Sequence, residues 1–441
     1  MAVTNFYGVD GSASGKAGST YANTIVHYYD KAGVKSANAI SVYAQFADRR
    51  SMPLKMGKTY KVSKWLHIFD RDTSAGDFKT KGYLTARNVI DVSKDIADNA
   101  SLAEGSGPVN KQNIKKVTIE TSFARYGEMI DYTDEVEMFS EDAVQVHYRE
   151  ELGLLANRRA EDLIQLDMLT GTNMMYVGSA TSIETVGADS SAVGAAAAGI
   201  LAGDNDDLSR VNYDLIRKAV RKLVRNRAEK NTTIVTGSTK IDTRTINKAF
   251  YAIIGPEVKY DLETVVKGAT GLGQEYAYVP AYKYADASNL AEGEVGAMND
   301  VRFIESESAL VYRGAGNLCP GTAAAGDGGY TGGLSNTAIP VGGGVLLDAY
   351  VEPANGHDSY NGYTDAEQRF DVFPILFPTK GSYATVGLKG NGKIKFNSQA
   401  PSKIELGNPY GTQGFFSYNM WFAGLILREE RLLKILVCAS E

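Results

Sequence analysis

The sequence is poor in the residues that most often build metal or redox sites. Its 441 residues include only 2 cysteines, Cys319 and Cys438, and 4 histidines. Two cysteines so far apart support neither a disulfide framework nor a Cys-rich zinc module, so we expect reduced thiols. The histidines stand singly and form no His-Glu-x-x-His pair, which argues against a metal site. We therefore expect no metal and no cofactor.

Long apolar runs and an excess of positive charge are also lacking. The least polar stretches, 192–203 and 420–427, fall short of the roughly 20 strongly apolar residues that a membrane helix needs. The first residues show no basic stretch followed by an apolar one, so we expect no secretion signal. Lys and Arg number 46 against 52 Asp and Glu, a net charge of −6. This balance disfavours a chain-wide basic surface for nucleic acid.

Motifs for catalysis or nucleotide binding are incomplete. The segment 11–17 resembles a phosphate-binding loop, but it has one residue too few between its glycines and lacks the terminal hydroxyl residue. The glycines of 268–273 and the acids of 204–207 lack the context of a dinucleotide or calcium site. No Gly-x-Ser-x-Gly elbow occurs. An enzyme is disfavoured, although a hydrolase with a dispersed active site stays open.

What the chain does have is a globular composition, with 44% hydrophobic residues, 46 glycines and 26 tyrosines. Periodicity and end signals predict helices at 140–169, 212–226 and 243–254, with Pro256 ending the last one. Most strands follow later in the chain, and the final runs 421–427 and 432–438 are expected to form a buried hairpin. Helices and strands segregate, so the predicted fold class is α+β.

A long two-stranded excursion is predicted before the first helix. Alternating residues at 79–90 and 117–123 form its strands, and the segment 101–108 looks like a flexible loop tip. A long hairpin alone cannot bury its faces, so it needs a partner. We expect the tip residues Ser101, Glu104, Gly105 and Pro108 to contact another subunit.

One helix carries a basic face. Arg217, Arg221 and Arg225 are spaced four apart, with Lys218 and Lys222 beside them. Local pairing with carboxylates is the favoured interpretation, because the rest of the chain is acidic. The alternative is weak contact with packaged nucleic acid or with a neighbouring subunit.

In order and combination, several segments resemble the major capsid proteins of tailed bacteriophages with the Hong Kong 97-type fold, in particular the podophage coat family related to coliphage N-four. The segments that carry the resemblance are 123–128, 132–135, 242–250, 254–257, 293–296 and 301–306.

The resemblance implies a division of the chain into five parts. These are an N-terminal arm at 1–70, an extended E-loop at 71–125, a peripheral domain with a long spine helix at 126–230, an axial domain at 231–414, and C-terminal strands at 415–441 that return to the peripheral domain. The segments 314–344 and 355–363 look like surface insertions.

The implied function is a non-enzymatic coat protein that self-assembles into an icosahedral shell around the double-stranded DNA of a tailed phage. The implied partners are further copies in pentamers and hexamers, a portal, scaffold or decoration proteins, and DNA through weak contacts, with no membrane. The protein would be made in the bacterial cytoplasm and end in the virion. A dispersed-site hydrolase and a non-capsid sheath or surface-layer protein are the alternatives.

Overall fold

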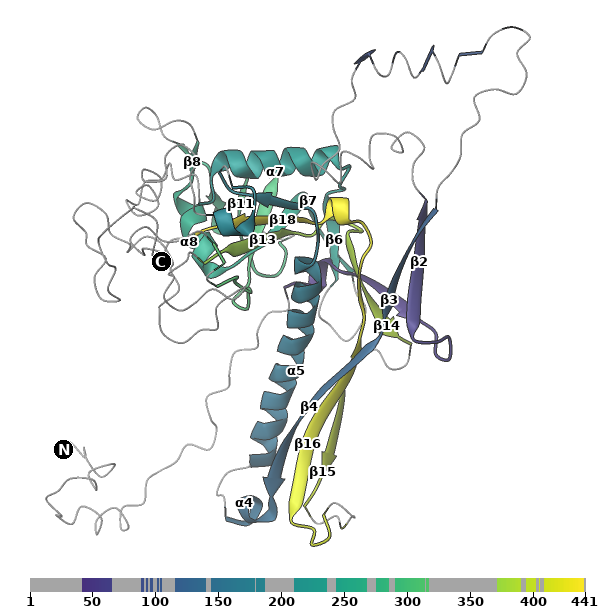
Figure 1. Ribbon diagram of the computed structural model, residues 1–441. Coiled ribbons are helices and arrows are strands. Elements are labelled where there is room, and N and C mark those ends of the chain that lie inside the picture. The colour runs from purple at the N-terminus through teal and green to yellow at the C-terminus, as the bar shows by residue number, and fades with distance from the viewer. Residues whose placement is uncertain are drawn as a thin grey trace, which may run out of the picture.

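The computed structural model describes residues 42–65, 116–139, 144–178, 180–186, 210–235, 243–267, 275–284, 290–313, 315–316, 371–389, 394–401 and 408–439, with isolated positions between 89 and 104 and at 404. A body built on one large sheet carries a long projection of one helix and three strands, and a separate two-stranded arm lies beside it (Figure 1).

The described elements fall along the chain as follows. The helices are α4 (Asp134–Phe139), α5 (Val144–Leu169), α7 (Tyr213–Arg225) and α8 (Pro256–Thr264). The strands up to the middle of the chain are β1 (Asp48–Met52), β2 (Thr59–Trp65), β3 (Lys116–Ser122), β4 (Ala124–Thr133), β5 (Met174–Tyr176), β6 (Asn231–Val235), β7 (Thr243–Ile254), β8 (Val266–Lys267) and β9 (Glu275–Tyr276). The later strands are β10 (Val279–Pro280), β11 (Glu294–Met298), β12 (Val301–Glu305), β13 (Phe373–Phe377), β14 (Tyr383–Leu388), β15 (Lys395–Gln399), β16 (Gln413–Phe422), β17 (Gly424–Ile426) and β18 (Leu433–Val437).

The large sheet has eight strands, in the order β10-β11-β12-β7-β13-β18-β5, with β6 paired to β7. Parallel and antiparallel pairs are mixed, since β7 runs parallel to β12 and antiparallel to β6. Helices cover a mixed sheet, as the predicted α+β class requires.

The strand β7 corrects a sequence-based prediction, because 243–254 was expected to be a helix. Its last residues, Phe250 to Ile254, are all buried, and alternate side chains enter two different apolar clusters. A strand covered on both faces has a continuous apolar run, which periodicity alone does not distinguish from a buried helix. Pro256 begins α8 at its first turn rather than ending a helix, with Gly255 as the N-cap residue.

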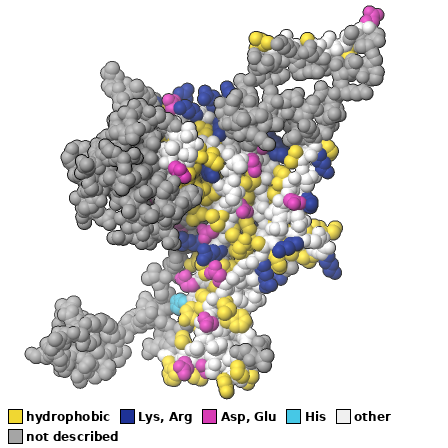
Figure 2. Space-filling view, viewed as in Figure 1, with side chains coloured by type: hydrophobic (Ala, Val, Ile, Leu, Met, Phe, Trp, Pro, Cys, Tyr) yellow, Lys and Arg dark blue, Asp and Glu magenta, His cyan; other side chains and the backbone are white. Residues whose placement is uncertain are grey.

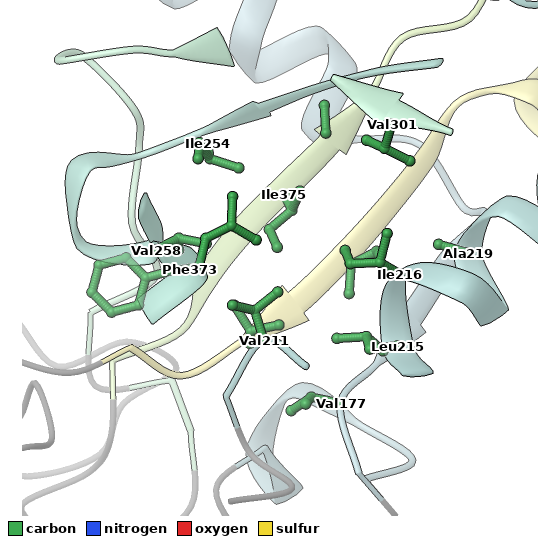
Figure 3. Packing of buried hydrophobic residues seen from close by; sticks show 14 of the residues in the cluster. Val177, Val211, Leu215, Ile216, Ala219, Ile254, Val258, Val301, Phe373 and Ile375 are labelled. Atoms are coloured by element: carbon green, nitrogen blue, oxygen red, sulfur yellow. The ribbon is translucent and has the colours of Figure 1, made fainter. Parts of the chain in front are cut away.

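The two faces of the large sheet pack against different elements. On one face α7 and α8 enclose a cluster that includes Ile216, Ala219, Val258 and Phe373 (Figure 3). On the other face the last turns of α5 pack with residues 42–47 and with Tyr251 and Ile253 of β7. The body is therefore one sheet between two apolar layers.

The long projection consists of α5 lying along the antiparallel sheet β15-β16-β4 (Figure 1). The strands β16 and β4 pair over their full length, from Gln413 opposite Thr133 to Phe422 opposite Ala124. Leu152 and Ala156 of α5 are buried against Phe416 and Tyr418. The long helix predicted at 140–169 is confirmed over Val144–Leu169, and Leu166 on it is exposed.

The arm, which we define as β2 and β3, is an antiparallel pair in continuous register from Thr59–Ser122 to Trp65–Lys116. The predicted excursion therefore has its first described strand at 59–65 and not at 79–90. Residues 79–88 lie outside the described residues, and Val89 and Ile90 are helical. The expectation of an extended N-terminal arm up to 70 is wrong for 42–52, because Val42 and Tyr43 enter the core and β1 pairs with β14.

The C-terminal strands divide between sheets, so the predicted hairpin of 421–427 and 432–438 is not formed. The strand β17 pairs with β14, whereas β18 pairs with β13 and β5 in the large sheet. The sequence predicted that 415–441 return to the peripheral domain at 126–230. The strand β16 does so, since it lies beside β4 and α5, whereas β18 joins the large sheet between β13 and β5. The segments 421–427 and 432–438 are apolar enough either to form a hairpin with each other or to pair with other strands. Packing in the folded chain therefore decides which strands they pair with.

Candidate assembly surfaces

The described residues show no group of three or more His, Cys, Asp or Glu that could hold a metal ion. His147 lies exposed on α5, and the other three histidines lie outside the described residues. The glycine-rich segments 11–17 and 268–273 and the acids 204–207 also lie outside them. Within the same part of the chain, no helix is long and apolar enough to cross a membrane. The surfaces that remain to be examined are those suited to contact other macromolecules.

The arm leans on the body with one face and leaves the other exposed. The inner face packs near Leu425 and Leu427 through Tyr60, Val62 and Ile119. Tyr60 and Val62 lie on the same face because side chains alternate along a strand. On the outer face, Lys61 and Glu120 form an exposed ion pair across the strands at 2.8 Å. At the end of the arm, Trp65 is 62% exposed with the Lys116 ammonium 5.7 Å from its ring centroid.

The predicted tip of the excursion is described only in part. Ser101 and Glu104 are exposed, and the Ser101 amide donates to the Ile96 carbonyl at 2.9 Å. Gly105 and Pro108 lie outside the described residues. Large apolar side chains near the tip are also exposed, namely Val89, Ile90, Ile96 and Leu102. Grouped apolar exposure of this kind is typical of a surface that meets another protein.

The basic face of α7 is exposed as the sequence predicts. Figure 2 shows Lys and Arg side chains gathered over this helix, where Arg217, Arg221 and Arg225 are all exposed. The helix begins as expected, because the Asn212 side chain accepts a hydrogen bond from the Leu215 amide at 2.8 Å. Val224 on this helix is 58% exposed, whereas Leu215 lies in the core.

Local pairing accounts for only part of this basic face. Arg217 forms an ion pair with Asp214 at 3.3 Å, one turn away, and stacks over Tyr213. Within the described part of the chain, neither Arg221 nor Arg225 forms an ion pair. The favoured interpretation from sequence, pairing with carboxylates, thus holds for one arginine of three.

The structure corrects the predicted place of Lys222, which the sequence put beside the basic face of α7 but which is buried; Lys434, to which the sequence assigned no role, is buried as well. Lys222 of α7 donates to the Met174 carbonyl at 2.8 Å, and burial lowers its pKa to about 8. Lys434 of β18 donates to the Leu169 carbonyl at the end of α5 at 2.7 Å, and burial lowers its pKa as well. Both satisfy carbonyls where elements meet, so they hold the body together rather than bind a partner.

An exposed surface that sequence analysis missed lies at the far end of the projection. Figure 2 shows hydrophobic and acidic side chains together there, over α4. Met138 and Phe139 of α4 are 75% and 83% exposed, and Glu135 is exposed beside them. A short helix after a long strand has no amphipathic period to reveal it, so only the acidic composition of this segment could have drawn attention to it.

No family model matches the sequence. The chain is 26% identical over 431 residues to the major capsid protein of Pseudomonas phage KPP21, covering 95% of this chain and 94% of that protein. Among solved structures it aligns with the capsid of Ralstonia phage GP4 at a TM-score of 0.49 and 12% identity, over 95% of this chain and 98% of that one. It also aligns with the capsid of Helicobacter pylori bacteriophage KHP30 at a TM-score of 0.48 and 8% identity, over 97% and 98% of the two chains. The predicted similarity to a phage major capsid protein is thereby confirmed.

Proposed function

We propose that this protein is the major capsid protein of a tailed bacteriophage, a structural subunit that assembles with copies of itself into the shell around the genome. One observation carries the proposal, namely sequence similarity along 95% of the chain to a protein of this function. The similarity extends over nearly the whole of both chains and is not confined to one motif.

The architecture supports this proposal on physical grounds. The projection and the arm extend from the body, and both leave large apolar side chains such as Trp65 and Phe139 exposed. Shapes of this kind gain stability when identical neighbours cover the exposed surfaces, and closed symmetric assemblies provide such neighbours. The hydrolase and the sheath or surface-layer protein have no comparable support.

The finer assignments belong to the same proposal. In it the fold is of the Hong Kong 97 type, α5 is the spine helix, and the excursion that begins with β2 and β3 is the E-loop. Its tip, including Ser101 and Glu104, folds over an adjacent subunit. The basic face of α7 makes weak contacts with DNA or a neighbour. The relationship to podophages, the portal and the scaffold stays a prediction from resemblance.

Electron microscopy of the expressed full-length chain tests the proposal. Closed shells with icosahedral symmetry are the expected product. Tubes or flat lattices would favour the sheath or surface-layer alternative, and a small discrete oligomer with hydrolytic activity would favour the enzyme. Either result would overturn the coat-protein assignment.

A further inference from the structure

A cleft of about 530 Å³ separates the arm from the body. The strands β1 and β2 line it together with Ile119 of β3, the turn at 380–381, and residues 427–431 after β17. It lies next to the contact through which Tyr60 and Val62 hold the arm against the body. Any group bound here would therefore touch the arm and the body at once.

The cleft has more positive than negative side chains. Five cationic side chains line it against two acidic ones, Asp48 and Glu229; the cations are Arg50, Lys64, Lys380, Arg428 and Arg431. Glu229 is engaged by Arg431 at 3.4 Å, and Lys64 lies 3.7 Å from Glu430. In the described part of the molecule, Arg428 and Lys380 form no ion pair of their own.

The electrostatics of the lining agree with this imbalance. Burial, followed by the positive charge of Arg428, lowers the pKa of the Arg431 guanidinium. Burial also raises the pKa of Asp48, although Arg50 and Lys380 oppose that shift. Arg428 and Arg431 thus lie close together, and burial disfavours the ionised form of Asp48 beside them. An added anionic group would stabilise such a site.

The shape and the apolar part of the lining favour a peptide over a nucleic acid. Val62, Trp65 and Leu427 contribute apolar surface, and the Arg431 side chain is only 12% exposed. Duplex DNA contacts proteins largely through its phosphates, which would leave this apolar part of the lining uncovered. A protein segment that carries both carboxylates and apolar side chains matches both parts of the lining.

The chain itself contains a segment with this chemistry. Between Arg125 and Arg149 there are seven acidic residues and no lysine or arginine. This stretch includes α4, where Val136, Met138 and Phe139 are all more than 40% exposed. In Figure 1, α4 lies at the far end of the projection from the arm, so it cannot enter the cleft of its own chain.

We propose that the cleft between the arm and the body receives the acidic, apolar α4 end of a second copy of this chain. The contact joins two different surfaces of identical subunits, and repeated contacts of this type form rings when the rotation between neighbours closes. It would add a second contact between arm and body to the one made by Tyr60 and Val62 whenever a neighbour is present. The inference rests on the proposed function and names a partner surface within it.

Reversal of charge on each side tests the contact. The cleft variant carries Lys380→Glu and Arg428→Glu, and the acidic-end variant carries Asp131→Lys and Glu135→Lys, all at exposed or half-exposed side chains. We expect each pair alone to lower the yield of shells at least about tenfold, because opposed like charges replace an attraction. A chain with all four changes should recover to within about threefold of the unaltered chain.

Controls separate this contact from general effects of charge. Circular dichroism and the thermal midpoint of unassembled subunits should match the unaltered chain for every variant. The control variant Lys389→Glu with Lys395→Glu makes the same charge change at exposed positions outside the cleft, and it should assemble normally.

Several results would overturn the inference. Normal shells from the cleft variant, or no recovery in the chain with four changes, would show that α4 does not occupy the cleft. Duplex DNA binding by unassembled subunits that the cleft variant loses would identify nucleic acid as the occupant instead. These results leave the proposed function intact, whereas an unaltered chain that forms no shells would count against the proposed function itself.

Discussion

The Tyr383 hydroxyl of β14 donates a hydrogen bond to Oδ2 of Asp167, 3.0 Å away near the end of α5. This bond ties the long helix to the sheet β1-β14-β17, against which the arm also rests. Burial raises the pKa of Asp167, while the hydrogen bond from Tyr383 opposes that shift. The projection and the sheet that supports the arm are thus joined by one half-buried polar pair.

Tyr383→Phe should lower the free energy of unfolding by about 1 to 3 kcal/mol, because it removes the donor of a hydrogen bond to a half-buried carboxyl. Urea denaturation of unassembled subunits measures the change. Tyr410→Phe is the matched control, since Tyr410 is 87% exposed. Equal effects of the two variants would show that the bond contributes nothing to stability.

Gly424→Ala should be more damaging than its size suggests. A Cβ on Gly424 would overlap both the Asp167 carboxylate and the Tyr383 hydroxyl. Because both partners must move, we expect a loss of about 2 kcal/mol or more in the free energy of unfolding. Gly153→Ala in α5 is the opposite case, since a Cβ there meets nothing within 4 Å and should stabilise by about 0.5 to 1 kcal/mol. Differential scanning calorimetry would show whether Gly424→Ala lowers the thermal midpoint and Gly153→Ala raises it.

Lys222→Met should change how stability depends on pH. The folded pKa of about 8 lies below the ordinary 10.5, so between these values the unfolded chain binds more protons than the folded one. The unaltered protein should therefore gain stability relative to the variant as pH rises from 8 towards 10.5, with a constant difference below 8. Unfolding curves across this range test it. Lys218→Met controls for loss of an exposed charge on the same helix, and the same trend in both variants would contradict the prediction.

Deletion of residues 101–108 should leave a folded, soluble subunit but prevent shell formation. The described tip residues Ser101, Leu102 and Glu104 are exposed, so their deletion removes little buried surface from the folded subunit. Sedimentation and electron microscopy would measure assembly. An equally long deletion at 324–331, in the predicted surface insertion, should assemble normally. Normal shells without 101–108 would remove the tip from the proposed interface.

Neutralising Arg217, Arg221 and Arg225 together with glutamine should leave folding nearly intact, because exposed pairs contribute only about 0 to 1 kcal/mol each. Any DNA affinity of unassembled subunits should fall and lose salt dependence, with a slope of about −0.9 per phosphate contact. Fluorescence anisotropy at several salt concentrations provides the measurement. Tight binding of one DNA sequence at physiological salt, lost in the variant, would contradict weak and non-specific contact.

Much of the local structure could be predicted because its signals lie within one segment. The helix α7 follows from the Asn212 cap, the apolar stripe around Ile216 and the basic outer face. The exposure of Arg217, Arg221 and Arg225 follows from the same periodicity.

The cleft could not be predicted, since its lining comes from residues far apart in the chain. Arg50 and Arg431 are ordinary surface residues by sequence, and nothing local indicates that they share a recess. Their juxtaposition depends on β1 pairing with β14 and on β2 leaning against Leu427.

The helices α5 and α7, the α+β class and the resemblance to phage coat proteins can all be inferred from the sequence, because helical periods, caps and motif order are local or linear properties. That 243–254 is a strand, that β2 is the partner of β3, and that β18 joins the large sheet became clear only from the folded chain. Strand pairing has no fixed sequence separation, and a strand buried on both faces carries no alternation to reveal it. The strand pairing that forms is the one that buries the apolar residues on both faces of the sheet.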